Sequence, residues 1–352
     1  MNLTKQRIVA PIVWALRHRG LAALLCAAAT VSAPLAATAE PITLKLSFFT
    51  SDRSHIYQNS IEPFVTAVNN EGGGLINIQV YFSGAISRNQ AEQPKLVADG
   101  AADIALIVPG RTPERFPDTE VMELPGLFSD QRQASLVYTR LLELGALKGY
   151  SDFFVIGGFV ASSESIHSRR PIKSVDDLQG LTIRVNNPIE ADTIRRLGAK
   201  PVLIAINETT EALMQNSIDG ATFPPSVLFE FGIGRVTNNH YMIQVGAAPT
   251  ALVMNRKKFE SLPPQAQAII RKYSGRWLVE RSAMGFDKVD KQTTAQLTSD
   301  PRRQVVFPAP ADLKRADEIF AAAVENWAAA SAHNREILSL VKSEITKLGG
   351  AN

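Results

Sequence analysis

The stretch SVDDLQGLTIRVNN, residues 174–187, decides the fold and carries an arginine whose purpose has to be explained. It opens with a helix-start pattern, and Gly180 marks a turn. From 181 to 185, apolar residues alternate with polar ones, which predicts a strand with one buried face. A helix is expected over 188–197. Arg184 therefore stands near the carboxyl end of a strand, before a polar loop and a helix start.

The first 39 residues have the pattern of a secretion signal. Four basic and no acidic residues precede an apolar, alanine-rich run over 21–35, and Ala37-Thr38-Ala39 has the small-x-small form of a cleavage site. A membrane anchor is the alternative, but the run is short and Pro34 interrupts it. We expect an exported protein that begins at Glu40 and resides in a bacterial periplasm.

Composition excludes several function classes for the rest of the chain. The only cysteine lies in the signal, so no disulfide is expected. The chain has 37 basic and 34 acidic residues, and without the four basic residues of the signal its net charge is −1. No excess of basic charge is then left for nucleic acid. No other stretch approaches the length of a membrane span, which predicts a soluble protein.

Predicted strands and helices alternate along the chain, which is typical of parallel βαβ units. The expected strands are 42–49, 76–82, 104–108, 181–185, 201–206, 250–254 and 305–307. The expected helices are 54–69, 87–99, 130–147, 188–197, 207–216 and most of 256–299 and 311–347. This pattern predicts two α/β lobes crossed more than once by the chain: 40–160 plus 250–290, and 161–249 plus 291–352.

Motifs that would indicate an enzyme are absent or weak. The four histidines after the signal stand too far apart for a helical zinc pair. The sequence has no nucleophile elbow, phosphate loop or dinucleotide fingerprint. An S-x-x-K pattern at 339–342 lacks its companion motifs. His167 stands beside Arg169 and Arg170, which favours a solvated loop. We predict neither an enzyme nor a cofactor or metal site.

Without catalytic motifs, a binding function becomes the leading prediction. Two-lobed α/β proteins hold small ligands between the lobes, at the carboxyl ends of strands. Arg184 suits a carboxylate there, because a planar guanidinium can meet both oxygens at once. The alternative is a surface arginine paired with a nearby carboxylate such as Glu190.

Residues 172–224 resemble the extracytoplasmic solute-binding proteins of tripartite ATP-independent periplasmic (TRAP) transporters, the DctP family. Three family patterns carry the resemblance: D-L-x-G-x-x-x-R-V at 177–185, L-G-A-x-P at 197–201, and an E to D-G pattern over 208–220. In the last of these, Met214 displaces Gln215 by one position. A looser likeness continues at 124–130 and 259–270.

The resemblance implies a two-lobed periplasmic binding protein fold with a long lobe-connecting helix. In this family the arginine of the R-V strand, here Arg184, holds the ligand carboxylate. The protein would capture an organic acid, close its lobes over it and deliver it to a TRAP-type integral membrane permease. A periplasmic binding protein that serves a sensor kinase is the alternative, since its binding lobes would look the same.

Departures from the family pattern predict a more apolar cleft. The family often reads D-G-x-E-N-P, and here Thr222 and Phe223 replace Glu and Asn. Phe49 stands where other members place a polar residue. Some sugar-acid binders of the family have a second arginine near the position that Glu164 occupies here. Arg111 stands at a position where such members have an arginine in the cleft.

The predicted ligand-binding residues are therefore Arg184, Arg111, Phe223, Phe49, Glu164, Asn186 and Asn187. They predict a monocarboxylate with an aromatic or branched apolar part, which stacks on a phenyl ring. A dicarboxylate or a sugar acid is the alternative ligand. The alternative for the rings of Phe49 and Phe223 is that each belongs to the hydrophobic core and does not contact the ligand. The alternative for Glu164 is an ion pair with Arg111.

Overall fold

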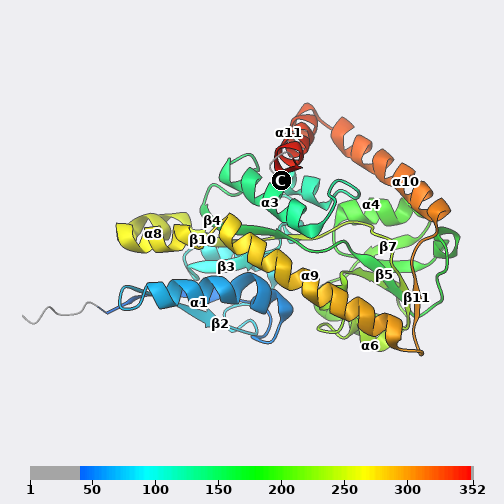
Figure 1. Ribbon diagram of the computed structural model, residues 1–352, viewed down its shortest axis with the longest axis horizontal. Coiled ribbons are helices and arrows are strands. Elements are labelled where there is room, and N and C mark those ends of the chain that lie inside the picture. Colours follow the sequence, from blue (N-terminus) through cyan, green and yellow to red (C-terminus); the bar gives the residue numbers. More distant parts are fainter. Residues whose placement is uncertain (1–39, 350–352) are drawn as a thin grey trace, which may run out of the picture. The chain divides into compact units, whose positions relative to one another are not determined.

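The structure is a computed structural model and describes residues 40–349. The predicted secretion signal, residues 1–39, lies outside the described residues. The strands of the described part form two sheets (Figure 1). No helix between residues 40 and 349 combines the length and the apolar composition needed to cross a membrane.

The first sheet has the strand order β2-β1-β3-β10-β4. Its strands are β1 (Ile42–Ser47), β2 (Ile76–Tyr81), β3 (Ile104–Ile107), β4 (Phe153–Val160) and β10 (Pro249–Asn255). β1 runs parallel to β2 and β3, as the βαβ pattern predicts, and η1 (Tyr57–Ile61), α1 (Glu62–Glu71) and α2 (Gln93–Ala98) connect them. β10 is antiparallel to β3 and β4, so the sheet is mixed.

The second sheet has the strand order β11-β9-β5-β8-β6-β7. Its strands are β5 (Ser165–Ser168), β6 (Thr182–Val185), β7 (Lys200–Leu203), β8 (Gly220–Phe223), β9 (Asn239–Tyr241) and β11 (Gln304–Val306). β6 lies between β7 and β8 and is parallel to both. α4 (Pro188–Arg196) and α5 (Thr209–Met214) provide the crossovers of this sheet.

Local interactions explain why the stretch 174–187 folds as predicted. Ser174 and Asp177 form a capping box at the start of η5 (Val175–Leu178). Gly180 has a φ of +75°, a left-handed conformation that favours glycine. The Asp219 carboxylate then accepts a hydrogen bond of 2.8 Å from the Thr182 backbone amide and aligns the start of β6. These contacts give the aspartates and the glycine of the motif a structural role.

Two chain segments cross side by side between the sheets. The segment 161–164 leaves β4 for β5, and the segment 245–248 leads back toward β10. Three backbone hydrogen bonds join them. The amides of Ala161 and Glu164 donate to the carbonyls of Ala248 and Gly246, and the Val245 amide donates to the Glu164 carbonyl. Residues at this crossing are therefore fixed with respect to both sheets.

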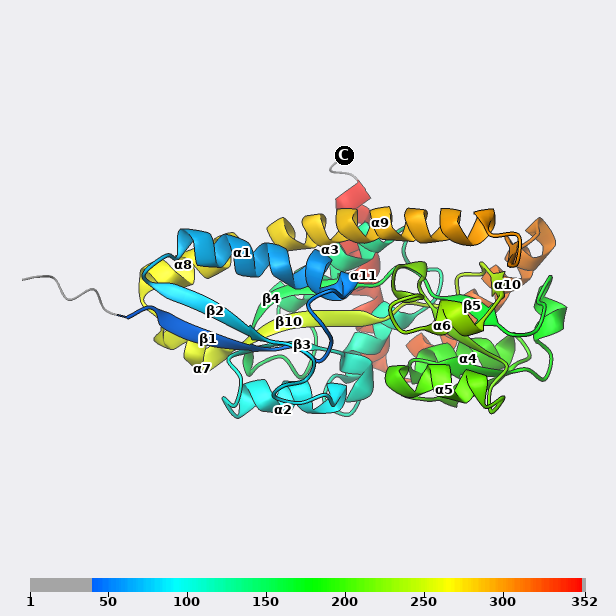
Figure 2. The ribbon, with the colours of Figure 1, turned by 90° about the horizontal axis from the view of Figure 1, so that it is seen from below.

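A long helix, α9 (Arg276–Ser299), connects the two lobes as predicted. Near its start it contacts α3 (Gln131–Glu143) and β4 beside the first sheet. Near its end it contacts η7 (Pro225–Val227) and β11 beside the second sheet, and Figure 2 shows it running along both. The chain thus has the two-lobed α/β fold with a long connecting helix.

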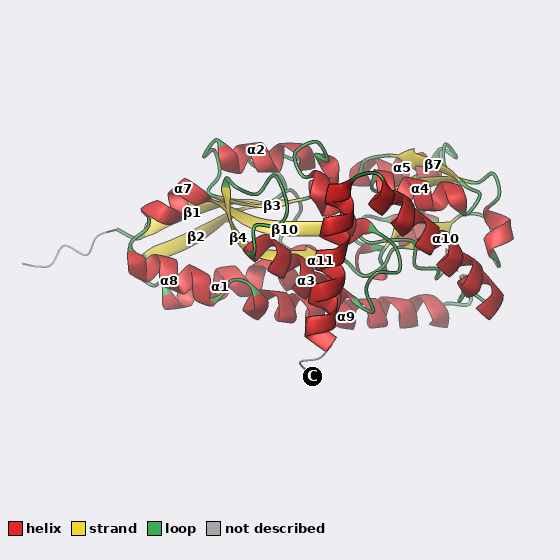
Figure 3. Ribbon diagram, turned by 90° about the horizontal axis from the view of Figure 1, so that it is seen from above, coloured by secondary structure: helices red, strands yellow, loops and turns green. Residues whose placement is uncertain are grey.

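The last two helices pack against different sheets. α10 (Pro310–Ala329) contacts α4 of the second sheet, whereas α11 (Ala332–Gly349) contacts α3 and lies across it in Figure 3. We keep the division 40–160 plus 250–290 and 161–249 plus 291–352 as a proposal; it counts α11 with the second lobe, although α11 contacts α3 beside the first sheet. The remaining helical elements are η2 (Gln90–Glu92), η3 (Pro109–Arg111), η4 (Pro117–Glu123), η6 (Ile206–Glu208), α6 (Ile233–Val236), α7 (Arg256–Ser261) and α8 (Pro264–Lys272).

Several sequence-based expectations differ from the structure. β4 and β5 had no strand prediction, because their runs contain glycines and a histidine instead of a clear alternation. The helix expected over 87–99 begins later, because Asn89 caps η2 and the Ser87 hydroxyl accepts from the Asn89 amide. The helix expected over 207–216 is shorter: α5 begins at Thr209, and Asn207 lies inside η6. The predicted solvated loop at His167 is wrong, because His167 is a fully buried residue of β5.

Candidate ligand-binding site

A cavity of about 100 Å³ lies where the two sheets meet the crossing segments. Among its lining residues only Arg184 and Glu164 are ionisable, and most of the others are apolar. The lining residues of the first sheet and its neighbouring segments are Phe49, Ile56, Ser60, Gln90, Leu106, Val108, Gln131, Phe159, Val160, Ala161, Ala248 and Thr250. Those of the second are Glu164, Arg184, Asn186, Ile206, Phe223, Pro224, Ser226, Val227 and Phe231, and α9 adds Phe286.

Arg184 lies on β6, next to its carboxyl end, and its side chain is 1% exposed. Its guanidinium donates hydrogen bonds to the Ile204 carbonyl (3.1 Å), the Thr222 carbonyl (3.3 Å) and the Asn186 amide oxygen (3.2 Å). Within residues 40–349 these acceptors are all uncharged. Arg184 therefore forms no ion pair with Glu190 there, and its positive charge faces the cavity without a directly paired carboxylate.

Phe223 lies beside Arg184, at the end of β8. Its ring centroid is 4.8 Å from the Arg184 guanidinium carbon, a cation–π arrangement. The ring is buried but belongs to the cavity wall. Phe49 also lines the cavity, whereas the neighbouring Phe48 is fully buried outside the wall, in the core of the first sheet.

Asn186 joins two arginines behind the cavity. Its side-chain oxygen accepts from Arg184 at 3.2 Å and from Arg111 at 3.0 Å. Arg111 ends η3, after β3 of the first sheet, and is not among the lining residues of the cavity. Asn186 therefore links the sheets through the two guanidinium groups, and Arg111 acts on the site from a second layer.

Asn187 has a structural position. It is the N-cap of α4, and its side-chain oxygen accepts from the Glu190 backbone amide at 2.7 Å. The Glu190 carboxylate in turn accepts from the Asn186 amide at 2.6 Å. Asn187 is buried and does not line the cavity, so its contacts fix the loop that follows β6.

Glu164 lies in the crossing segment and is 3% exposed. Burial raises its pKa well above the usual range, and the neighbouring charge of Glu190 raises it further. The positive charge of Arg184 lowers this pKa, but by less than burial raises it. Burial therefore favours the neutral form of this carboxyl group beside the arginine in the cavity wall.

Sequence reasoning missed Glu123, at the end of η4. It is 2% exposed, and burial raises the pKa of its carboxyl group well above the usual range, with Glu120 and Glu190 contributing. Arg111 is the opposing charge. No sequence signal separates this glutamate from a surface residue, because its neighbours in the structure come from distant parts of the chain.

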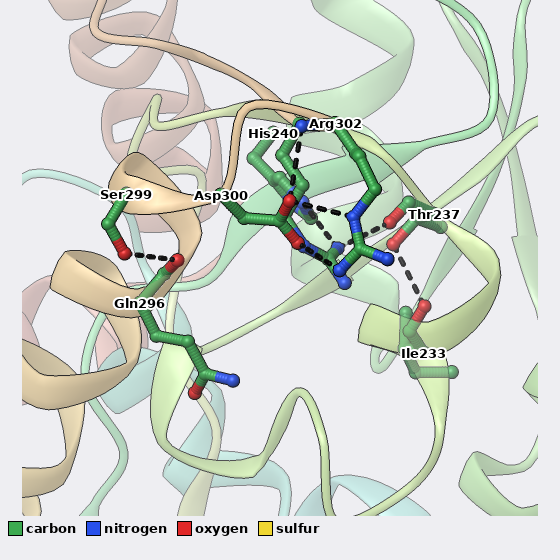
Figure 4. A network of polar contacts seen from close by, with 8 residues as sticks. Ile233, Thr237, His240, Gln296, Ser299, Asp300 and Arg302 are labelled. Atoms are coloured by element: carbon green, nitrogen blue, oxygen red, sulfur yellow. Dashed lines mark hydrogen bonds and ion pairs between the residues drawn. The ribbon is translucent and has the colours of Figure 1, made fainter.

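A pair of buried histidines supports the cavity wall from behind. The Nδ1 atoms of His167 and His240 are 2.8 Å apart, and His167 Nε2 lies 3.1 Å from the Phe223 carbonyl oxygen. Since that carbonyl can only accept, His167 Nε2 carries the proton, and His240 Nδ1 must donate to His167 Nδ1. His240 Nε2 then accepts from Arg303, which Asp300 binds at the end of α9; Figure 4 shows the surroundings of Asp300 and His240.

The comparison with known protein families decides the class of the chain. The model of the bacterial extracellular solute-binding proteins, family 7 (DctP), matches residues 46–330. The chain belongs to the DctP family. It is accordingly a solute-binding protein of the TRAP type and not an enzyme, as predicted.

Curated relatives within the DctP family cover most of the chain. A solute-binding protein of Verminephrobacter eiseniae is 26% identical over 239 residues, 66% of this chain and 70% of the relative. The C4-dicarboxylate-binding periplasmic protein of Rhodobacter capsulatus is 25% identical over 268 residues, 73% of this chain and 78% of the relative.

Solved structures of the same type superpose well. A TRAP solute-binding protein of Rhodoferax ferrireducens, in complex with copurified benzoate, has a TM-score of 0.77 and 26% identity and covers 88% of this chain and 99% of its own. A marine metagenome protein specific for aromatic acids has a TM-score of 0.82 at 22% identity, with coverages of 88% and 99%. The second of these likenesses supports the fold alone.

A second cavity, of about 470 Å³, adjoins the first in this DctP-family protein. The loop over 124–132, the crossing segment and α9 line it. Gln131, Val160 and Ala161 line both cavities. The wall between the two is thus thin, and these three residues form it.

Proposed function

We propose that this chain captures an organic monocarboxylate with an aromatic or branched apolar part in the cavity around Arg184 and delivers it to a TRAP-type membrane permease. The observation that carries the proposal is a buried guanidinium without a directly paired carboxylate in a mostly apolar cavity. A buried charge without a partner is costly, and a ligand carboxylate would supply that partner.

The apolar cavity wall supports the proposal that the ligand has an aromatic or branched apolar part. Phe49, Phe223, Phe231 and Phe286 all line the cavity, so a ligand ring can stack on or pack against them. The cavity is also small compared with pockets for drug-sized molecules, which suits an acid with a single ring or a short branched chain. The benzoate complex of the Rhodoferax relative, at 26% identity, agrees with this choice.

A C4-dicarboxylate is the second candidate. The Rhodobacter relative is described as a C4-dicarboxylate-binding protein, and Arg111 lies behind Asn186 as a second positive charge. A sugar acid is a weaker candidate, since it needs several hydrogen-bonding partners and the wall offers few. A role in signalling through a sensor kinase would use the same cavity. We also propose a periplasmic location, which matches the family.

The first test uses residues 40–352 and a panel of acids measured by thermal shift and isothermal titration calorimetry. The panel contains benzoate and phenylacetate, a branched 2-oxo acid, succinate and glucuronate. We expect binding of the aromatic or branched monocarboxylates. Binding of succinate or glucuronate alone would reject the proposed ligand class while keeping a carboxylate receptor.

Arg184→Ala is the matching variant in that test, with Arg184→Lys as the conservative control. Removal of the guanidinium leaves the ligand carboxylate buried and unpaired, so we expect a loss of about 3 kcal/mol in binding free energy. Lysine keeps the charge but not the planar fork and should lose less. Affinity within twofold of the native protein in Arg184→Ala would contradict the proposed role of Arg184.

A further inference from the structure

Glu164 brings an unpaired carboxyl oxygen into the wall of the cavity around Arg184. The residue lines the cavity and is 3% exposed. Its Oε2 is buried, and no group among residues 40–349 forms a hydrogen bond with it. No other described residue of the cavity wall has a buried side-chain nitrogen or oxygen without a partner. Leaving such an oxygen unpaired costs free energy, so a donor from outside the chain would stabilise the site.

The backbone fixes Glu164 at this place. Its amide donates to the Gly246 carbonyl at 2.8 Å, and its carbonyl accepts from the Val245 amide at 3.0 Å. The carboxyl group can still turn about its last side-chain bond, and this rotation exchanges its two oxygens. Either oxygen of Glu164 can therefore meet a group that enters the cavity.

The free donors of Arg184 determine where the ligand carboxylate goes. A guanidinium has five N–H groups. Nε, Nη1 and Nη2 of Arg184 each donate one hydrogen bond within the described chain, so Nη1 and Nη2 each keep one further N–H. Two such groups can donate to the two oxygens of one carboxylate. The donor for Glu164 must then come from a second polar group of the same ligand.

We propose that Glu164 binds a hydroxyl group of the ligand, so that the site selects hydroxy-substituted monocarboxylates with an apolar part over the same acids without the hydroxyl. This inference rests on the proposed function, and Glu164 is its specificity determinant. A ligand without the hydroxyl leaves the carboxyl oxygen of Glu164 buried and unpaired, which lowers its affinity.

The charge of the site favours a hydroxyl over an ammonium group. The ligand carboxylate already balances Arg184, and burial favours the neutral form of Glu164. An ammonium group would therefore bring an uncompensated positive charge into a mostly apolar cavity. A hydroxyl supplies both a donor and an acceptor without any charge, and a neutral carboxyl group can pair with both.

The first test compares matched acids by titration calorimetry with residues 40–352. Each enantiomer of mandelate is paired with phenylacetate, and 3-hydroxybenzoate is paired with benzoate. We expect the hydroxylated acid to bind about tenfold more tightly, or better, in at least one pair. The fluorinated analogues, α-fluorophenylacetate and 3-fluorobenzoate, have no proton to donate and should bind like the unsubstituted acids.

Three outcomes of this comparison would overturn the inference. They are equal affinities within every pair, a fluorinated acid as tight as its hydroxylated counterpart, and tighter binding of phenylglycine than of mandelate. The last would show an ionised Glu164 that binds an ammonium group. Failure of every acid to bind would instead reject the proposed function.

Two variants assign the preference to Glu164. Glu164→Gln keeps the size, a donor and an acceptor, so we expect it to keep the affinity ratio of hydroxylated to unsubstituted acid. Glu164→Met is of similar length but forms no such hydrogen bond, and its ratio should fall to about one. Glu123→Met is the matched control, because Glu123 is 2% exposed and has an unpaired Oε2 but does not line the cavity.

The control should keep the native ratio. A native ratio in Glu164→Met, a ratio lost in Glu164→Gln, or an equal loss in Glu123→Met would each contradict the role of Glu164. A ratio of affinities does not depend on a general loss of stability in a variant. If Glu164→Met does not fold, Glu164→Gln and the fluorinated acids still decide.

Discussion

At the scale of single residues, the proposed site is built around one arginine, Arg184. Arg184 is buried in a place where a guanidinium is usually avoided, and burial lowers its pKa, although Glu164 and Glu190 oppose this. The three neutral acceptors fix its orientation but leave its charge for a ligand. The position of Arg184 could be predicted from the motif, because strand, turn and cap are all local in sequence.

Phe223→Leu tests the stacking role of the ring that faces Arg184. A leucine fills part of the space but removes the ring face, so we expect an aromatic acid to bind about fivefold more weakly, equivalent to about 1 kcal/mol. Titration calorimetry with benzoate gives this number. Phe48→Leu is the matched control, because Phe48 is equally buried but outside the cavity. It should lower stability and leave the affinity unchanged; an equal loss in both variants would contradict the prediction.

At the scale of elements, the cap of α4 connects helix geometry to the site. Asn187→Ala removes the hydrogen bond to the Glu190 amide, and we expect a loss of about 1 kcal/mol in the free energy of unfolding. Denaturant unfolding measures it. Asn207→Ala is the control, since the exposed Asn207 caps no helix and should change stability by less than about 0.5 kcal/mol. Equal effects would mean that the cap is not what stabilises α4.

The histidine pair connects β5 and β9, and it makes stability depend on pH. Burial lowers the pKa of His167 to about 4 and that of His240 to about 3, from an ordinary value of 6.5. Between pH 6.5 and 4 the unfolded chain binds protons that the folded chain does not bind. The pair's contribution is therefore complete above pH 6.5 and is lost as the pH falls, by at most about 1.4 kcal/mol per pH unit for each histidine.

His240→Gln should therefore show a shallower decline in stability over this range than the native protein. The comparison is between slopes, measured by denaturant unfolding at several pH values, so a general loss of stability in the variant does not affect it. His333→Gln is the control, because His333 lies away from the pair, beside Asp118. A slope as steep in His240→Gln as in the native protein would contradict the assigned neutral state of the pair.

At the scale of the whole molecule, a ligand in the cavity contacts residues that belong to both sheets and to α9. Binding should therefore stabilise the whole folded unit. At a ligand concentration one hundred times Kd we expect about 2.7 kcal/mol more stability. Chemical denaturation with and without a bound acid measures this gain. Arg184→Ala at the same ligand concentration should show almost none of it, and a full gain in that variant would place the binding elsewhere.

Much of the fold could be predicted because its signals are short-range. The capping box at Ser174, the turn at Gly180 and the alternation that follows specify β6 and place Arg184 at its carboxyl end. The long helical pattern after residue 255 likewise indicated α9. β4 and β5 were not predicted, because their residues are buried through pairing with distant strands and lack an alternating pattern of their own.

The sequence by itself determined the family and the two α/β lobes, and it pointed to the arginine that we propose as the carboxylate-binding residue. Only the tertiary structure decided the partners of that arginine. Asn186 bridges it to Arg111 from the other sheet, and His167 meets His240, 73 residues away. The physical reason is that burial and charge compensation depend on neighbours in space, and a local sequence pattern carries no record of which distant residues the fold brings together.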